Sequence, residues 1–214
     1  MDEEITIINT NTRSQKIKNF LLNNKKKIII IISIIFFLLL AYLFLGEIEK
    51  RNKAKLANQY NIAKINFRIG EGDKTTQDLI KIIKSEDATY SPLALYFLID
   101  NDLINNQKEM NILFDTLIKD TKLEKNIKDL IIYKKALFNS DFVSENELIQ
   151  ILNPIINSKS IWKSHSLYLI AEYFYSRNEK QKAKEFFNQI LTLDNVNNDI
   201  KVETQKRINR DLSE

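Results

Sequence analysis

Residues 164–197 read SHSLYLIAEYFYSRNEKQKAKEFFNQILTLDNVN, and this stretch predicts two amphipathic helices joined by a short polar turn. Four apolar residues of its first half recur with the spacing of one helical face: Leu167, Ile170, Ala171 and Phe174. A second apolar stripe follows the turn: Ala183, Phe187 and Ile190. Because alanine side chains are small, Ala171 and Ala183 let the two helices approach closely, and the ring of Phe187 fills the gap. The stretch therefore predicts an antiparallel helix pair that buries both stripes.

This helix pair resembles a tetratricopeptide repeat, a two-helix unit that recurs with a period of roughly 34 residues. Counterparts of Ala183 are expected at Met110 and Leu148, which lie 38 residues apart, with a further 35 residues from Leu148 to Ala183. Three positions depart from the usual pattern: Leu167 replaces tryptophan, Phe174 replaces tyrosine and Asn195 replaces proline. The resemblance implies that residues 46–214 form a short α-α superhelix of stacked pairs. A plain helical bundle is the alternative.

The composition favours an all-α protein. The 214 residues include 3 glycines and 2 prolines, whereas 44% are hydrophobic and 28% are charged. Tight hairpins, phosphate-binding loops and β-sandwiches need more glycine and proline than this, but packed amphipathic helices do not. The chain has no cysteine and one histidine, which excludes disulfides and thiol nucleophiles and argues against a metal site. We therefore predict an all-α protein without a cofactor. The succession of amphipathic stretches and polar joints from Glu47 onward predicts nine helices and no strand.

Several helix ends are predicted from capping and breaking residues. The first helix after the apolar segment is expected to end at Gly70. Ser91 is expected to provide the N-cap of the third helix, directly before Pro92 in its first turn. Ser144 and Glu147 have the spacing of a capping box, which predicts the start of the sixth helix.

Residues 28–45, IIIIISIIFFLLLAYLFL, form a segment of 18 residues without an ionisable side chain. As a helix this segment spans about 27 Å, close to the thickness of the hydrocarbon core of a bilayer. A buried core helix would show a polar stripe, and only Ser33 and Tyr42 interrupt the apolar surface here. A cleaved signal peptide usually has a shorter apolar region and a small-x-small cleavage site. The segment therefore predicts a single transmembrane helix that stays attached.

The distribution of basic residues predicts the orientation of this helix in the membrane. Residues 1–27 carry six basic and three acidic residues, whereas residues 46–60 carry four basic residues. The positive-inside rule then favours a short cytoplasmic tail over residues 1–27 and places residues 46–214 in the periplasm of a Gram-negative bacterium, anchored in its inner membrane. The small bias leaves the reverse orientation open. Residues 46–214 carry 26 basic and 25 acidic residues, which argues against nucleic-acid binding.

A stripe of polar and aromatic residues on the helix after Ser160 is the candidate binding surface. His165, Tyr168, Glu172 and Tyr175 are separated by three or four residues and therefore share one helical face. In tetratricopeptide-like stacks this side of the first helix lines a groove, and tyrosines there suit an extended peptide or a partner helix. Tyr96 and Tyr133 are expected at analogous positions of earlier pairs. The alternative is that these tyrosines pack against the final helix.

Catalytic patterns are weak throughout the sequence. Ser164 and Ser166 flank the single imidazole of His165, but neighbouring residues of a helix point to different faces, and a nucleophile needs its base on the same side. Paired acids are expected by chance in a chain with 28 acidic residues. We therefore predict a protein without enzymatic activity, and with no metal and no small-molecule substrate.

The overall layout resembles the YfgM-like family of ancillary Sec translocon subunits. The similarity is best in the basic stretch before the apolar segment, in residues 89–95 (TYSPLAL) and in the succession of helices up to Leu212. The resemblance implies association with the Sec translocon and with a membrane-anchored periplasmic chaperone, in a role that assists exported proteins. Two alternatives use the same architecture: an envelope or cell-division scaffold, and a membrane-anchored cell-wall hydrolase. The lipid bilayer is a partner in each case.

Overall fold

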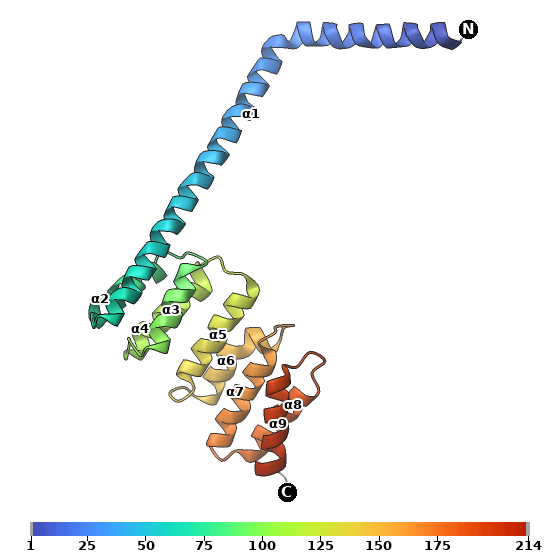
Figure 1. The fold of residues 1–214 in the computed structure, drawn as a ribbon. Coiled ribbons are helices and arrows are strands. Elements are labelled where there is room, and N and C mark those ends of the chain that lie inside the picture. The colour runs from blue at the N-terminus through green and yellow to red at the C-terminus, as the bar shows by residue number, and fades with distance from the viewer. Residues whose placement is uncertain (1, 213–214) are drawn as a thin grey trace. The chain divides into compact units, whose positions relative to one another are not determined.

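The computed structural model describes residues 2–212, with side chains described from residue 15 onward. Within this range it contains nine α-helices and one π-helix, and it contains no strand, which confirms the predicted all-α class. Figure 1 shows the elements in chain order: α1 (Asp2–Arg68), α2 (Gly72–Ile83), α3 (Tyr90–Asp100), α4 (Gln107–Asp115), η1 (Thr116–Asp120), α5 (Lys125–Asn139), α6 (Glu145–Ile156), α7 (Lys163–Ser176), α8 (Lys180–Leu191) and α9 (Asn198–Asp211).

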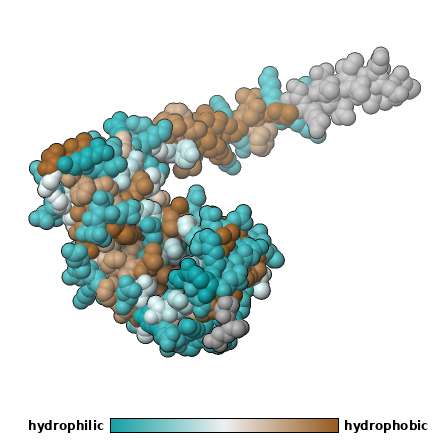
Figure 2. Space-filling view, turned by 60° about the horizontal axis from the view of Figure 1, so that its bottom comes forward, coloured by the Kyte–Doolittle hydropathy of each residue, from teal (hydrophilic) through white to brown (hydrophobic). Residues whose placement is uncertain are grey.

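The chain forms two compact units, Met1–Lys55 and Leu56–Glu214. The first unit consists of the helical residues of α1 up to Lys55, among them residues 28–45. Its apolar stretch is long enough to cross a membrane, and 0% of this stretch is buried. Figure 2 shows mostly brown surface along this helix, with some teal and pale atoms, whereas the second unit has more teal surface with scattered brown areas. The structure is thus compatible with a single-pass anchor or a signal sequence. Of the six basic residues in the predicted cytoplasmic tail, Arg13 has a side chain that lies outside the described part of the structure.

The boundary between the units falls at Leu56, later than the predicted domain start at residue 46. Residues between the apolar segment and Leu56 are exposed and make ion pairs within their own helix. Arg51 pairs with Glu47 at 3.0 Å and Lys53 pairs with Glu49 at 2.9 Å. Leu56 is the first residue of α1 whose side chain packs against a buried core. Compact packing therefore begins where apolar residues of α1 first meet α2 and α3.

The second unit is a stack of helices in which each helix packs against the next one or two along the chain. Contacts join α2 with α3, α5 with α6, α6 with α7, α7 with α8 and α8 with α9. The odd-numbered helices also contact one another across the stack, α5 with α7 and α7 with α9. Figure 1 shows α3, α5, α7 and α9 following one another along this unit. Side chains of successive odd-numbered helices are therefore brought onto a shared surface.

Two apolar clusters form the core of this unit, one over α1 to α5 and the other over α5 to α9. Ile118 of η1 packs against both clusters, so the core is continuous along the stack. Every residue of the two predicted apolar stripes is buried: Leu167, Ile170, Ala171, Phe174, Ala183, Phe187 and Ile190. Met110 and Leu148 are buried as well, on α4 and α6. The periodicity of the sequence therefore identified the buried faces of these helices.

The predicted helix ends are partly confirmed. Gly70 follows α1 with a φ of +90°, a left-handed conformation that favours glycine, and Ser144 with Glu147 forms the predicted capping box. The predicted N-cap role of Ser91 is wrong. The N-cap residue of α3 is Thr89, and the carboxylate of Asp87 accepts hydrogen bonds from the backbone N–H groups of Thr89 and Tyr90 at 2.9 and 2.7 Å. The Ser91 hydroxyl is buried and donates to the carbonyl of Ile82 at 2.7 Å, which ties α3 to α2.

Candidate functional site

The six predicted site residues lie on three odd-numbered helices. Tyr96 belongs to α3 and Tyr133 belongs to α5, whereas His165, Tyr168, Glu172 and Tyr175 belong to α7. Most of them contact a side chain of the next odd-numbered helix along the stack, so the described side chains form three junctions, between α3 and α5, between α5 and α7, and between α7 and α9.

The junction between α3 and α5 is a contact between a tyrosine ring and an ammonium group. Nζ of Lys134 lies 5.0 Å from the ring centroid of Tyr96 and 3.9 Å from Oδ1 of Asp100. The hydroxyl of Tyr96 is buried without a hydrogen-bond partner, and burial raises the pKa of this phenol to about 12. Tyr96 therefore stays neutral at physiological pH, with its hydroxyl enclosed by the protein.

The junction between α5 and α7 is an aromatic cluster of Tyr133, Trp162 and His165. The rings of Tyr133 and Trp162 stack with centroids 5.9 Å apart, and the ring of His165 lies 5.1 Å from Trp162 and 6.0 Å from Tyr133. Nε1 of Trp162 donates to the backbone carbonyl of Asn126 at 3.1 Å, which fixes the indole on the start of α5. Burial lowers the pKa of His165, so the imidazole is predominantly neutral at pH 7.

Trp162 and Lys134 were not among the predicted site residues. Trp162 precedes the first residue of α7 by one position, so helical spacing alone did not include it in the stripe of His165. Lys134 follows Tyr133 directly and shares the surface because it reaches back to α3. The single tryptophan of the chain, just before an amphipathic stretch, is the signal in the sequence that points to this cluster. We call Tyr96, Lys134, Tyr133, Trp162 and His165 together the aromatic face.

The junction between α7 and α9 is a charged network centred on Arg207. Nε and Nη2 of Arg207 donate to the two carboxylate oxygens of Glu172, each at 2.7 Å, and Nη1 donates to Asp211 at 2.9 Å. The guanidinium also lies 4.9 Å from the ring centroid of Tyr175. Burial, followed by the carboxylate of Glu172, raises the pKa of Tyr168. Arg207 of α9 therefore covers Glu172 and Tyr175, which agrees with the alternative that this side of α7 packs against the final helix.

No acid–base or nucleophilic arrangement forms around the single histidine in the described part of the chain. Nδ1 of His165 and the hydroxyls of Ser164 and Ser166 are all buried without a hydrogen-bond partner. A nucleophilic serine would require a hydrogen bond to its base, and neither hydroxyl reaches the imidazole. In the part of the chain whose side chains the structure describes, no three histidine, aspartate or glutamate side chains converge to hold a metal ion.

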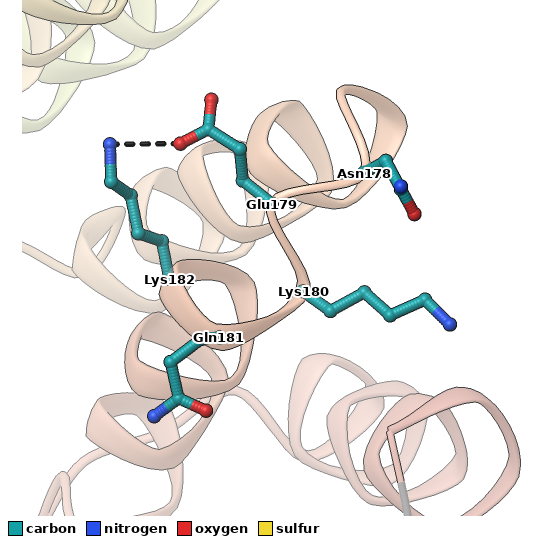
Figure 3. Close-up of a pocket in the computed structure, with 5 residues that line it drawn as sticks. All are labelled: Asn178, Glu179, Lys180, Gln181 and Lys182. Atoms are coloured by element: carbon teal, nitrogen blue, oxygen red, sulfur yellow. Dashed lines mark ion pairs between the residues drawn. The ribbon is translucent and has the colours of Figure 1, made fainter.

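A surface hollow at the turn between α7 and α8 lies apart from the aromatic face. Asn178, Glu179, Lys180, Gln181 and Lys182 line it. Figure 3 shows the ion pair between Glu179 and Lys182, which measures 2.8 Å, and shows Lys180 extending away from it. Lys182 also pairs with Glu145 of α6 at 2.8 Å, and the hydrogen bonds to Glu145 and Glu179 raise the pKa of Lys182. These ion pairs join α6 to the start of α8.

The chain was compared with protein-family models, with curated proteins and with solved structures. None of the three comparisons finds a match.

Proposed function

We propose that this protein is a membrane-anchored protein-interaction module whose second unit is a tetratricopeptide-like stack, with no enzymatic activity. The observation that carries the proposal is the aromatic face, where side chains from three successive odd-numbered helices meet. In a stack of paired helices the first helix of each pair lines the groove, and α5 and α7 are the first helices of the pairs α5–α6 and α7–α8, whereas α3 packs against α2.

The chemistry of the aromatic face suits a partly apolar protein segment. Tryptophan and tyrosine are enriched at the centres of protein interfaces, because each provides a large rigid apolar surface together with a polar group. Ile161 is exposed directly beside Trp162 and extends the apolar area.

The position of α9 limits the site to the region between α3 and the start of α7. Glu172 and Tyr175 interact with Arg207 of α9, so a bound segment would meet Tyr96, Tyr133 and His165 first. A segment extended at about 3.3 Å per residue needs only a few residues to cross neighbouring helices that lie roughly 10 Å apart. The proposed ligand is therefore a short exposed segment of another protein.

The proposed location is the bacterial inner membrane, with the N-terminus in the cytoplasm and residues 46–214 in the periplasm. The fully exposed apolar stretch of α1 supports the anchor, and the excess of basic residues before it supports the orientation. The resemblance to YfgM-like proteins suggests the partners, namely Sec translocon subunits, a membrane-anchored periplasmic chaperone and exported chains that emerge from the channel.

Site-specific photocrosslinking in living cells tests the interaction. A photoreactive residue is placed at Tyr96 and at Ile161, and a control is placed at the fully buried Phe187. Adducts with translocon subunits, the chaperone or exported chains at the first two positions support the proposal. Adducts with division proteins instead favour the scaffold alternative, and yields no higher than at Phe187 refute binding at the aromatic face.

Alkaline extraction of membranes tests the anchor separately. An anchored chain stays in the membrane pellet and keeps the full mass of 25.2 kDa. A soluble product shortened by the tail and the apolar segment would show that α1 includes a cleaved signal sequence. Labelling of single cysteines at Lys18 and Lys206 with a membrane-impermeant maleimide then gives the orientation, because the chain has no other cysteine.

A further inference from the structure

A short amphipathic segment of α1, residues 15–27, directly precedes the apolar stretch. Ile17, Phe20 and Leu21 are 58%, 63% and 48% exposed, and their spacing of three and four residues places them on one helical face. They belong to neither of the two apolar clusters of the described structure. Leu22 is also apolar but lies on another side of the helix. We call residues 15–27 the basic segment, because five of them are lysines.

Lysines border the apolar face of the basic segment on both sides. At about 100° per residue, Lys16 and Lys27 lie roughly a quarter turn to one side of Ile17, and Lys18 and Lys25 lie roughly a quarter turn to the other side. The opposite side of the helix is polar, with Gln15, Asn19 and Lys26. Lysine side chains at such borders extend along the apolar surface while their ammonium groups reach the lipid headgroups. This arrangement is typical of a helix that lies on a membrane surface.

The positive charge of the basic segment is not compensated within the described structure. Residues 5–46 contain no acidic residue, and the three acids of the tail lie at positions 2–4. Among the described side chains, no ion pair includes a lysine of the basic segment. On the other side of the apolar stretch, Glu47 pairs with Arg51 and Glu49 pairs with Lys53. Uncompensated cations are therefore concentrated on the N-terminal side of the apolar stretch.

The place of the basic segment in the chain favours a lipid surface over a protein partner. Lys25, Lys26 and Lys27 directly precede residues 28–45 in the same helix, so an anchored chain holds these lysines at the level of the headgroups. Anionic headgroups attract lysines that lie next to a membrane, and the boundary between headgroups and acyl chains accepts an apolar helical face. An acidic protein would attract the lysines, but the anchor would not hold it against this face.

Two asparagines lie where the helix has to bend if the apolar face is to reach the membrane surface. Asn23 and Asn24 separate this face from Lys25, and asparagine is a weaker helix former than leucine or lysine. Nδ2 of Asn24 donates to the carbonyl of Phe20 at 3.0 Å. In a regular helix the backbone N–H of Asn24 binds this same carbonyl, so the side chain competes with the helical hydrogen bond. The bend is therefore expected at these two residues.

We propose that the basic segment is a membrane-surface helix that binds anionic phospholipids. Ile17, Phe20 and Leu21 insert between the headgroups, and the lysines contact the lipid phosphates. The inference rests on the anchor of the proposed function, but it depends neither on the protein partners nor on the orientation of the chain. Its expected property is a preference for anionic over zwitterionic lipid, because lysines are attracted to a surface with net negative charge.

Fluorescence quenching of the full chain in lipid nanodiscs tests this preference. The chain has no cysteine, so Leu21→Cys introduces a single thiol for a dye on the apolar face. In discs that contain about 30% phosphatidylglycerol in phosphatidylcholine, doxyl groups near the top of the acyl chains are expected to quench this dye. In discs of phosphatidylcholine alone the quenching is expected to be at least about fivefold weaker. Asn19→Cys is the matched control on the opposite side of the helix, and its dye is expected to stay weakly quenched in both discs.

Removal of two lysines shows whether charge causes the preference. Lys16→Gln together with Lys18→Gln leaves Lys25, Lys26 and Lys27 beside the anchor. In the Leu21→Cys background, these two substitutions are expected to lower the ratio of inserted to free segment in the anionic discs by about fivefold for each lysine removed. Unchanged quenching in this variant would contradict binding through the lysines.

A dye within the apolar stretch separates this inference from the anchor. At Ser33→Cys, lipids with doxyl groups deep in the acyl chains are expected to quench the dye in both kinds of disc. Quenching at Ser33 without quenching at Leu21 refutes only the surface helix, whereas an unquenched dye at Ser33 refutes the anchor. Equal quenching at Leu21 in both lipid compositions, or equal quenching at Leu21 and Asn19, would overturn the proposal. In native membranes, adducts of a photoreactive residue at Leu21 with an acidic protein in place of lipid would overturn it as well.

Discussion

Replacement of Arg207 by leucine is expected to release α9 from α7 without unfolding the rest of the stack. Two hydrogen bonds from Arg207 to the carboxylate of Glu172 form the polar link between α9 and α7, and a third, to Asp211, lies within α9. Leucine keeps part of the apolar stem and removes the guanidinium. The buried residues that α9 itself contributes near this contact are few, Thr204 and the following Leu212. A local effect on α9 is therefore expected.

The free energy that the ion pair of Arg207 and Glu172 contributes follows from its partial exposure to solvent. Hydrogen bonds to charged groups contribute about 1.5–3 kcal/mol when buried, whereas exposed ion pairs contribute about 0–1 kcal/mol. The side chains of Arg207 and Glu172 are each 26% exposed, which places the pair between these cases. We expect the link to contribute about 1.5 kcal/mol after allowance for screening by water. Since about 1.4 kcal/mol changes an equilibrium constant tenfold, local opening of α9 increases about tenfold.

Hydrogen exchange of the detergent-solubilised full chain, followed by mass spectrometry, measures this opening. Amides of α9 are expected to exchange about tenfold faster in Arg207→Leu, and amides of α5 and α6 at an unchanged rate. A double-mutant cycle with Glu172→Met isolates the interaction between the two side chains. A coupling free energy near zero, or equal acceleration in α5 and α9, would refute the argument that Arg207 holds α9 to α7.

Three further predictions concern the core and the titrating groups. Phe187→Ala is expected to lower the free energy of unfolding by about 3–5 kcal/mol in urea titrations, because Phe187 is fully buried, whereas the exposed Phe142→Ala changes it by less than about 0.5 kcal/mol. Burial raises the pKa of Asp115, but hydrogen bonds and charge interactions, led by those with Lys135, outweigh burial and lower this pKa overall. The ion pairs of Asp115 therefore stabilise the fold fully above the unfolded pKa of about 3.9, and this stabilisation is lost as the pH falls below that value. In Asp115→Asn the free energy of unfolding is expected to depend less on pH below about 3.9 than in the unmodified chain. The pKa of His165 is expected to lie below the ordinary value of about 6.5, because the imidazole is partly buried. A proton NMR titration measures it, since the single histidine gives an unambiguous signal. A midpoint at or above about 6.5 would contradict the burial of the ring beside Trp162.

The sequence by itself determined the features that depend on neighbours a few residues apart. The 3.6-residue periodicity identified the buried stripes of α7 and α8, and Gly70 and the box of Ser144 with Glu147 marked helix ends. These features could be predicted because hydrogen bonds and side-chain contacts within a helix join residues no more than four apart. The apolar segment was equally evident, because its length and lack of charge are local properties.

Tertiary structure alone decided which helix faces meet and therefore which residues form the candidate site. Glu172 and Arg207 lie 35 residues apart, and their pairing covers one half of the predicted stripe. Trp162 joined the aromatic face because its indole reaches the carbonyl of Asn126, 36 residues earlier in the chain. Ser91 binds Ile82 and is no helix cap, because the packing of α3 on α2 buries its hydroxyl. Contacts of this range depend on the approach and rotation of whole helices, which small differences in packing select and a single sequence pattern does not encode.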